Sequence, residues 1–132
     1  MNSVEEYFNH VQQLIDHTPD AAIERYEEQL LSENRGVLRI RLRFPDEALL
    51  EISEAIVIIA GEPHWIAYRY HYQGPSAELV FGYDDAPHHP EIPTHPDHKH
   101  FRDQVLGNPR PSIDQVLLEV VAIRERARQS KV

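Results

Sequence analysis

The chain has 132 residues, with 22 acidic and 13 basic side chains and a formal charge of −9 when all histidines are neutral. This length predicts one domain that folds without a disulfide or a metal. Cysteine is absent, which excludes disulfides, thiolate catalysis and zinc–thiolate sites. No apolar run approaches the ~20 residues of a membrane span, and the first residues lack an export signal, so we expect a cytoplasmic protein that does not enter membranes. The acidic charge argues against strong, non-specific binding of nucleic acids.

Helical spacing of apolar residues predicts a helix near each end of the chain. The first helix begins after Ser3, which forms a capping box with Glu6, and the second begins after Ser112, paired in the same way with Gln115. We expect residues 124–132 to form a frayed polar tail. The apolar stripes are Val4, Phe8, Val11 and Ile15 in the first helix and Ile113, Val116, Leu117, Val120 and Ile123 in the second.

Between the helices, alternation of apolar and polar residues predicts an antiparallel meander of four or five strands. Residues 21–32 are compatible with a helix or a strand, and the turn residues that follow favour a strand. The remaining strands are expected at residues 38–44, 48–58, 64–72 and 79–83. Together these elements predict an α+β fold in a single domain over residues 1–132.

The pairing of two of these strands follows from their pattern. A three-residue loop at residues 45–47 places Leu42 opposite Leu50 and Arg41 opposite Glu51. In the next strand we expect one face to hold Ile66, Tyr68, Tyr70 and Tyr72, and the other face to hold Trp65, Ala67, Arg69 and His71.

Residues 84–100 follow the last predicted strand and are unusual in composition. This segment holds five of the nine histidines and four of the ten prolines, so we expect a stiff loop without regular structure. Imidazoles on such a loop can act as general acid and base near neutral pH. With Lys99 or an arginine to stabilise negative charge on phosphorus, they could cleave RNA through its 2′-hydroxyl without a metal.

Two other uses of the same segment remain open. His95, His98 and His100 could ligate zinc or another divalent transition metal, with an aspartate adding an oxygen ligand. The loop could also be an exposed turn, or a contact surface for another protein, without catalysis. His88 and His89 are adjacent, so at most one of them is expected to share a site with the other histidines.

Two rows of side chains on the predicted sheet are weaker candidates. Arg39, Arg41 and Arg43 share one face and could bind phosphates, although arginines are also common on the solvent side of a strand. The tyrosine stripe of residues 68–72 could stack on bases, but such a stripe more often belongs to the core.

Three stretches of the chain together resemble a known family. They are Tyr68–Gln73 (YRYHYQ), Phe81–Pro90 (FGYDDAPHHP) and His95–His100 (HPDHKH). Their order and spacing resemble the TumE family, small bacterial proteins described as toxin components of toxin–antitoxin pairs. Gly82 stands where the family pattern commonly has an arginine.

The resemblance implies a compact α+β toxin with a histidine-centred site and a small helix-turn-helix antitoxin as partner. Joined to the chemistry above, it gives a hypothesis of a metal-independent endoribonuclease that acts on RNA. The candidate catalytic residues are His98, His100, Lys99, Asp84 and His88, and the candidate substrate-binding residues are Arg69, Tyr83, His89 and Arg41.

Overall fold

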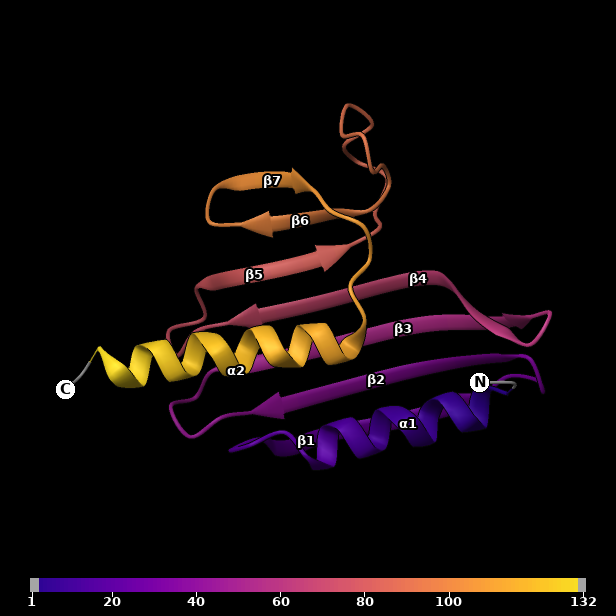
Figure 1. The fold of residues 1–132 in the computed structure, drawn as a ribbon, viewed down its shortest axis with the longest axis horizontal. Helices are drawn as coiled ribbons and strands as arrows, with labels where there is room; N and C mark the ends of the chain where they lie inside the picture. Colours follow the sequence, from indigo (N-terminus) through magenta and orange to yellow (C-terminus); the bar gives the residue numbers. More distant parts are fainter. Residues whose placement is uncertain (1–2, 131–132) are drawn as a thin grey trace.

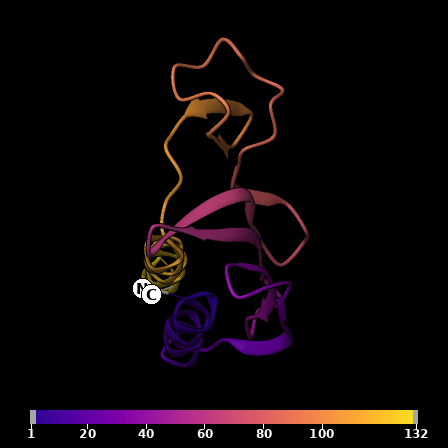
Figure 2. The same cartoon turned by 90° about the vertical axis from the view of Figure 1, so that its right-hand side faces the viewer.

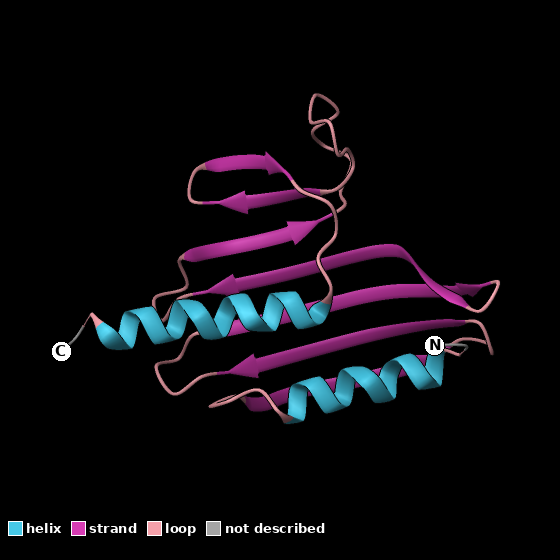
Figure 3. Cartoon of the chain, in the orientation of Figure 1, coloured by secondary structure: helices cyan, strands magenta, loops and turns pink. Residues whose placement is uncertain are grey.

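A computed structural model describes residues 3–130 of the chain. Two helices and seven strands follow one another along the sequence (Figures 1 and 3). None of the helices within the described residues is long and apolar enough to cross a membrane. The elements are α1 (Val4–Asp16), β1 (Ala22–Leu30), β2 (Arg35–Arg43), β3 (Leu49–Ile59), β4 (Glu62–Gln73), β5 (Leu79–Asp84), β6 (His98–Phe101), β7 (Gln104–Gly107) and α2 (Ile113–Gln129).

The seven strands form one antiparallel meander in which every strand pairs with its neighbours in sequence, in the order β1 to β7. Figure 2 shows both helices on the same side of this sheet. The apolar core lies between that side and the helices, and includes the buried Phe8 of α1, Leu38 and Leu50 of the sheet and Val116 of α2. Within residues 3–130, no helix covers the other face of the sheet, which leaves side chains accessible over several of its strands.

The predicted α+β architecture is confirmed, but the strand number is wrong. Residues 98–107, of which we expected the first three to be loop, form the hairpin β6–β7 and extend the sheet beyond β5. His98 and His100 therefore lie on a strand and not in a loop. The pattern did not reveal these strands because each has four residues and β6 reads His-Lys-His-Phe, without apolar alternation. Pairing with β5 holds β6 in place, and β7 pairs in turn with β6.

Most local predictions are confirmed. Ser3 accepts a hydrogen bond from the Glu6 backbone N–H, and Ser112 forms a complete capping box with Gln115. Residues 22–30 are a strand, as the turn chemistry favoured. Arg41 lies opposite Glu51 and Leu42 lies opposite Leu50, as the three-residue loop requires.

The predicted alternation along β4 fails at one position. A bulge shifts the register between Ala55 and Ile56 of β3, so that Trp65 pairs with Ile56 and Ile66 is left between pairs. Trp65 consequently packs against the core, with its ring edge-on to Tyr7, while Ile66 is exposed. We expected the opposite orientation for both, because a strict period of two ignores bulges.

The second helix continues through the region expected to fray. It ends at Gln129, and Arg124 lies over the ring of Phe44 and forms an ion pair with Asp46 at 2.9 Å. The side chain of Arg124 is only 12% exposed. This cation holds the C-terminal half of α2 against the loop between β2 and β3.

Close packing of α1 on the sheet depends on Gly36 in β2. A Cβ atom at this position would lie 2.5 Å from Val4 and 2.8 Å from Phe8. We expect Gly36→Ala to lower the free energy of unfolding by about 1–3 kcal/mol because the helix must move away. Urea denaturation measures this loss, and Gly82→Ala is the matched control, since a Cβ there meets nothing closer than 3.6 Å. Equal stability of the two variants would contradict the prediction.

Candidate functional site

Three ionisable side chains meet where β5 ends beside β6. Asp84 lies directly opposite His98, and His100 follows two residues later on the same face. The Nε2 atom of His98 is 3.0 Å from Asp84 Oδ1 and 3.1 Å from His100 Nε2, and His100 Nε2 is 3.6 Å from Asp84 Oδ2. We call Asp84, His98 and His100 the histidine–aspartate cluster.

The buried member of this cluster has a fixed orientation. His98 is 2% exposed, and its Nδ1 lies 2.9 Å from the carbonyl oxygen of Pro96. A carbonyl only accepts, so Nδ1 carries the proton. The second nitrogen, Nε2, then faces the Asp84 carboxylate and His100. In a neutral His98 this atom offers a lone pair, and a proton or a cation is needed to hold the three groups together.

His89 brings a third imidazole to the histidine–aspartate cluster. Its ring centroid is 5.2 Å from that of His98 and 6.2 Å from that of His100. The side chains of His89 and His100 are 32% and 34% exposed, so these two rings can reach a bound molecule while His98 cannot. Burial, and to a lesser degree the neighbouring histidines, lower the pKa of His100, opposed by Asp84.

Three hydrogen bonds fasten the proline-rich loop to the sheet. Tyr68 of β4 donates its backbone N–H to Asp85 at 3.2 Å and its hydroxyl to Asp97 at 3.0 Å. Asp84 accepts from the backbone N–H of Ala86 at 2.9 Å. The loop is therefore tied at both ends, which places His89 above the strand pair.

The open face of the sheet joins the cluster to a row of arginines. Arg69 of β4 lies directly opposite Asp84, so it shares the face of the cluster. Arg39 and Arg41 of β2 also lie on this face, and with Arg25 and Arg69 they line a pocket of about 260 Å³. Arg41 is 3.5 Å from Glu51, which is the predicted cross-strand pair. Arginines from three strands thus face the same side as the histidines.

Two predicted site residues lie on the opposite face. Lys99, between the two histidines of β6, forms an ion pair with Glu119 of α2 at 2.8 Å. Tyr83 is buried on the same side and donates its hydroxyl to Glu119 at 2.6 Å. The structure does not bring Lys99 or Tyr83 to the cluster, because alternate residues of a strand point to opposite faces. They hold α2 on the sheet instead.

Two further histidines of the segment lie apart from the cluster. His88 and His95 are exposed on the loop, and the ligand atoms that converge belong to Asp84, His98 and His100. The predicted ligand set with His95 is thus not the set that the structure assembles. The aspartate that the sequence offered as an oxygen ligand is Asp84.

A buried polar cluster on the helix side was missed by the sequence reasoning. Glu54 of β3 is 1% exposed and accepts hydrogen bonds from the hydroxyls of Tyr7 and Tyr70. Arg110 lies 3.9 Å from its carboxylate and stacks on Trp65, 3.3 Å from the ring centroid. A signal was present, because Glu54 occupies an apolar phase of β3 between Ile52 and Ile56.

This cluster predicts a pH-dependent stability. Burial raises the pKa of Glu54, so the folded state holds the proton more tightly than the unfolded state. Stability is therefore lost as the pH rises above the unfolded value of about 4.3, towards the folded pKa. Glu54→Gln removes this loss, and its free energy of unfolding relative to wild type should increase by up to about 1.4 kcal/mol per pH unit in that window.

Urea denaturation of wild type and Glu54→Gln at a series of pH values above that of unfolded glutamate measures this difference. The matched control is Glu62→Gln, at an exposed position, whose difference from wild type should stay constant. A constant difference for Glu54→Gln as well would contradict the prediction.

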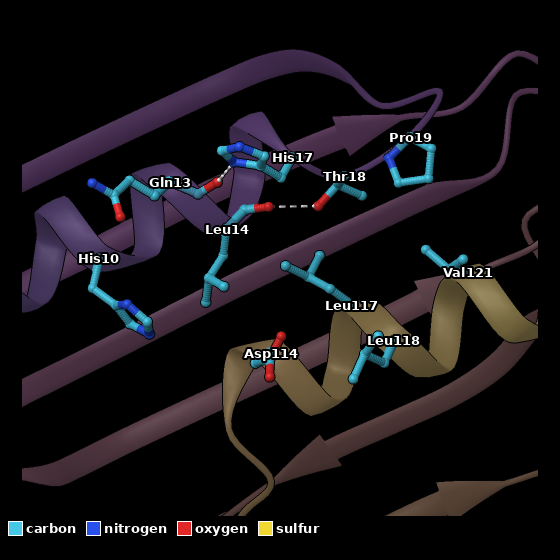
Figure 4. Close-up of a pocket in the computed structure, with 10 residues that line it drawn as sticks. All are labelled: His10, Gln13, Leu14, His17, Thr18, Pro19, Asp114, Leu117, Leu118 and Val121. Carbon is cyan, nitrogen blue, oxygen red and sulfur yellow. Dashed lines mark hydrogen bonds between the residues drawn. The ribbon is translucent and has the colours of Figure 1, made fainter.

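The helix side also has a groove between α1 and α2. It has a volume of about 410 Å³, and Leu14, Leu117 and Leu118 supply much of its wall (Figure 4). His10 of α1, His17 at its C-cap and the turn that follows also line the groove. The groove lies across the sheet from the histidine–aspartate cluster and shares no residue with it.

Comparison with known families decides what the chain is related to. The family model described as "Toxin TumE" matches residues 11–128. The chain belongs to the TumE toxin family. The match covers the C-terminal part of α1, the whole sheet, the cluster and nearly all of α2, and so includes every candidate site residue. A toxin-like role follows, with an antitoxin as the general kind of partner. No curated protein and no solved structure matches the chain.

Proposed function

We propose that the chain is the toxin of a toxin–antitoxin pair and acts as a metal-independent endoribonuclease on the open face of its sheet. The observation that supports this most is the pair of partly exposed imidazoles, His89 and His100, whose ring centroids lie 6.2 Å apart beside the buried His98. Two imidazoles at this separation can each reach one oxygen of a phosphodiester.

In the proposed reaction, the rings of His89 and His100 each make one proton transfer. One of them, His89 or His100, takes the proton of the ribose 2′-hydroxyl, and the 2′-oxygen attacks phosphorus. The other donates a proton to the 5′-oxygen as the bond from phosphorus to that oxygen breaks. The products are a 2′,3′-cyclic phosphate and a 5′-hydroxyl. His98 and Asp84 do not touch the substrate in this scheme and act as positioning residues for His100.

Substrate binding is assigned to the arginines of the open face. Arg69 lies beside the cluster, opposite Asp84, and Arg41 lies two strands further along. A guanidinium group can hold a phosphate by two hydrogen bonds. These local cations offset the net charge of −9, which otherwise opposes RNA binding. We assign inhibition of the toxin to a partner protein, a helix-turn-helix antitoxin.

Incubation of the purified chain with RNA in excess chelator tests the proposal. We expect cleavage to persist without a metal, and mapped ends to carry cyclic phosphate and 5′-hydroxyl. Expression with and without the adjacent reading frame gives the cellular test, in which co-expression should restore growth. Growth inhibition in cells whose RNA stays intact would exclude the endoribonuclease activity and retain the toxin role.

A further inference from the structure

We propose that Asp84, His98 and His100 bind one divalent transition-metal ion of the zinc type, and that the bound ion blocks the site. The binding part stands on the geometry alone, and the blocking part rests on the proposed function. The ion and the substrate protons would compete for the same nitrogen of His100.

The spacing of the three ligand atoms fits one ion. Nitrogen and oxygen ligands lie about 2.0–2.2 Å from zinc, so two ligands at a tetrahedral angle are roughly 3.3–3.6 Å apart. In the cluster, His98 Nε2 lies 3.0 Å from Asp84 Oδ1 and 3.1 Å from His100 Nε2, and His100 Nε2 lies 3.6 Å from the other carboxylate oxygen, Oδ2. Small rotations of the Asp84 carboxylate and of the His100 ring, both partly exposed, are enough to bring one oxygen and the two nitrogens to the tetrahedral values.

The surroundings of His98 also fit a ligand. Its Nδ1–H donates to the Pro96 carbonyl, which fixes the tautomer that presents a lone pair at Nε2. A metal-bound histidine almost always has such a partner on its other nitrogen. His98 is buried, so little entropy is lost when its ring is held by an ion.

The donor set favours a borderline metal. Two imidazole nitrogens and one carboxylate oxygen suit zinc, iron or nickel better than magnesium or calcium, which prefer oxygen ligands. Three protein ligands leave a fourth tetrahedral position open for water. The ring of His89, 5.2 Å from that of His98, brings a further imidazole close to the cluster.

Titration of the full chain, freed of metal by chelator, with Co²⁺ tests the binding part. We expect one ion per chain and the visible absorption of tetrahedral cobalt, which zinc displaces. His100→Ala and Asp84→Asn should each weaken binding at least tenfold, while circular dichroism shows that both remain folded. The matched controls are His88→Ala and His95→Ala, exposed histidines of the same loop, which should bind as wild type. Equal binding by all variants, or weakening by the controls, would overturn the site.

A separate assay tests the blocking part. Stoichiometric zinc should inhibit RNA cleavage, and excess chelator should restore it. Stimulation by zinc would overturn both the block and the metal-independent mechanism, while the cobalt spectrum would still establish the site. Absence of cleavage under every condition would overturn the nuclease and the block together. The cobalt titration involves no RNA, so it distinguishes failure of the metal site from failure of the proposed nuclease.

Discussion

His100→Ala should lower the rate of RNA cleavage by about 10²–10⁴-fold, which is the usual contribution of one general acid or base. The exposed ring of His100 is one of the two that can reach a phosphodiester, so its removal deletes one proton transfer. His89→Ala deletes the other and should have an effect of similar size. The double variant should be hardly slower than either single variant, because the two groups act as a unit.

The measurement is the initial rate of cleavage in chelator, together with growth inhibition in cells. His88→Ala is the matched control, since this exposed neighbour of His89 lies outside the cluster and should retain the wild-type rate. Combined replacement of His98 and His100 by alanine should abolish toxicity without unfolding the chain. If the variant with both His98→Ala and His100→Ala is folded and as toxic as wild type, the proposed mechanism is excluded.

Glu54→Ala should lower the free energy of unfolding by about 2–6 kcal/mol, because two buried hydroxyls lose their acceptor at about 1–3 kcal/mol each. The carboxylate accepts from Tyr7 and Tyr70, and both hydroxyls would lose their acceptor in the interior. Arg110 would keep its position on Trp65 but lose the nearest opposite charge.

Urea denaturation at neutral pH measures this loss, and Glu54→Gln is the matched control. Glutamine keeps the volume of the side chain and one acceptor oxygen, so its loss should be clearly smaller. The buried polar cluster around Glu54 connects α1, β3, β4 and the segment before α2, so we expect one cooperative unfolding transition. A loss below about 1 kcal/mol for alanine, within the range of a single ordinary hydrogen bond, would contradict the assigned role.

Sequence reasoning found the elements whose signals are local. The capping residues Ser3 and Ser112 and the alternation in β2 depend only on near neighbours, and each predicted its element correctly. The register of β2 on β3 followed from matching apolar faces. These features require no knowledge of distant contacts.

The errors concern features that depend on distant partners. The strand β6 is stable because β5 pairs with it, and nothing in His98–Phe101 reveals that pairing. The partner of Lys99, Glu119 of α2, is 20 residues away in sequence, so Lys99 was assigned to the same site as its neighbours. The bulge that turns Trp65 inward arises where β3 and β4 shift register, and a single strand carries no sign of it. The histidines themselves were found because their clustering is compositional.

The side chains of β6 alternate between the two faces of the sheet, so a change in the number of its residues disturbs it more than a substitution does. His98 and His100 point to one face, and Lys99 and Phe101 point to the other. Insertion of one residue between His98 and Lys99 would place Lys99 on the open face and His100 on the helix side, so that the lysine leaves Glu119. Insertion of two residues would restore the faces. Natural variation in this strand should therefore consist of substitutions and paired insertions, while a single-residue insertion would remove the site and the anchor of α2 in one event.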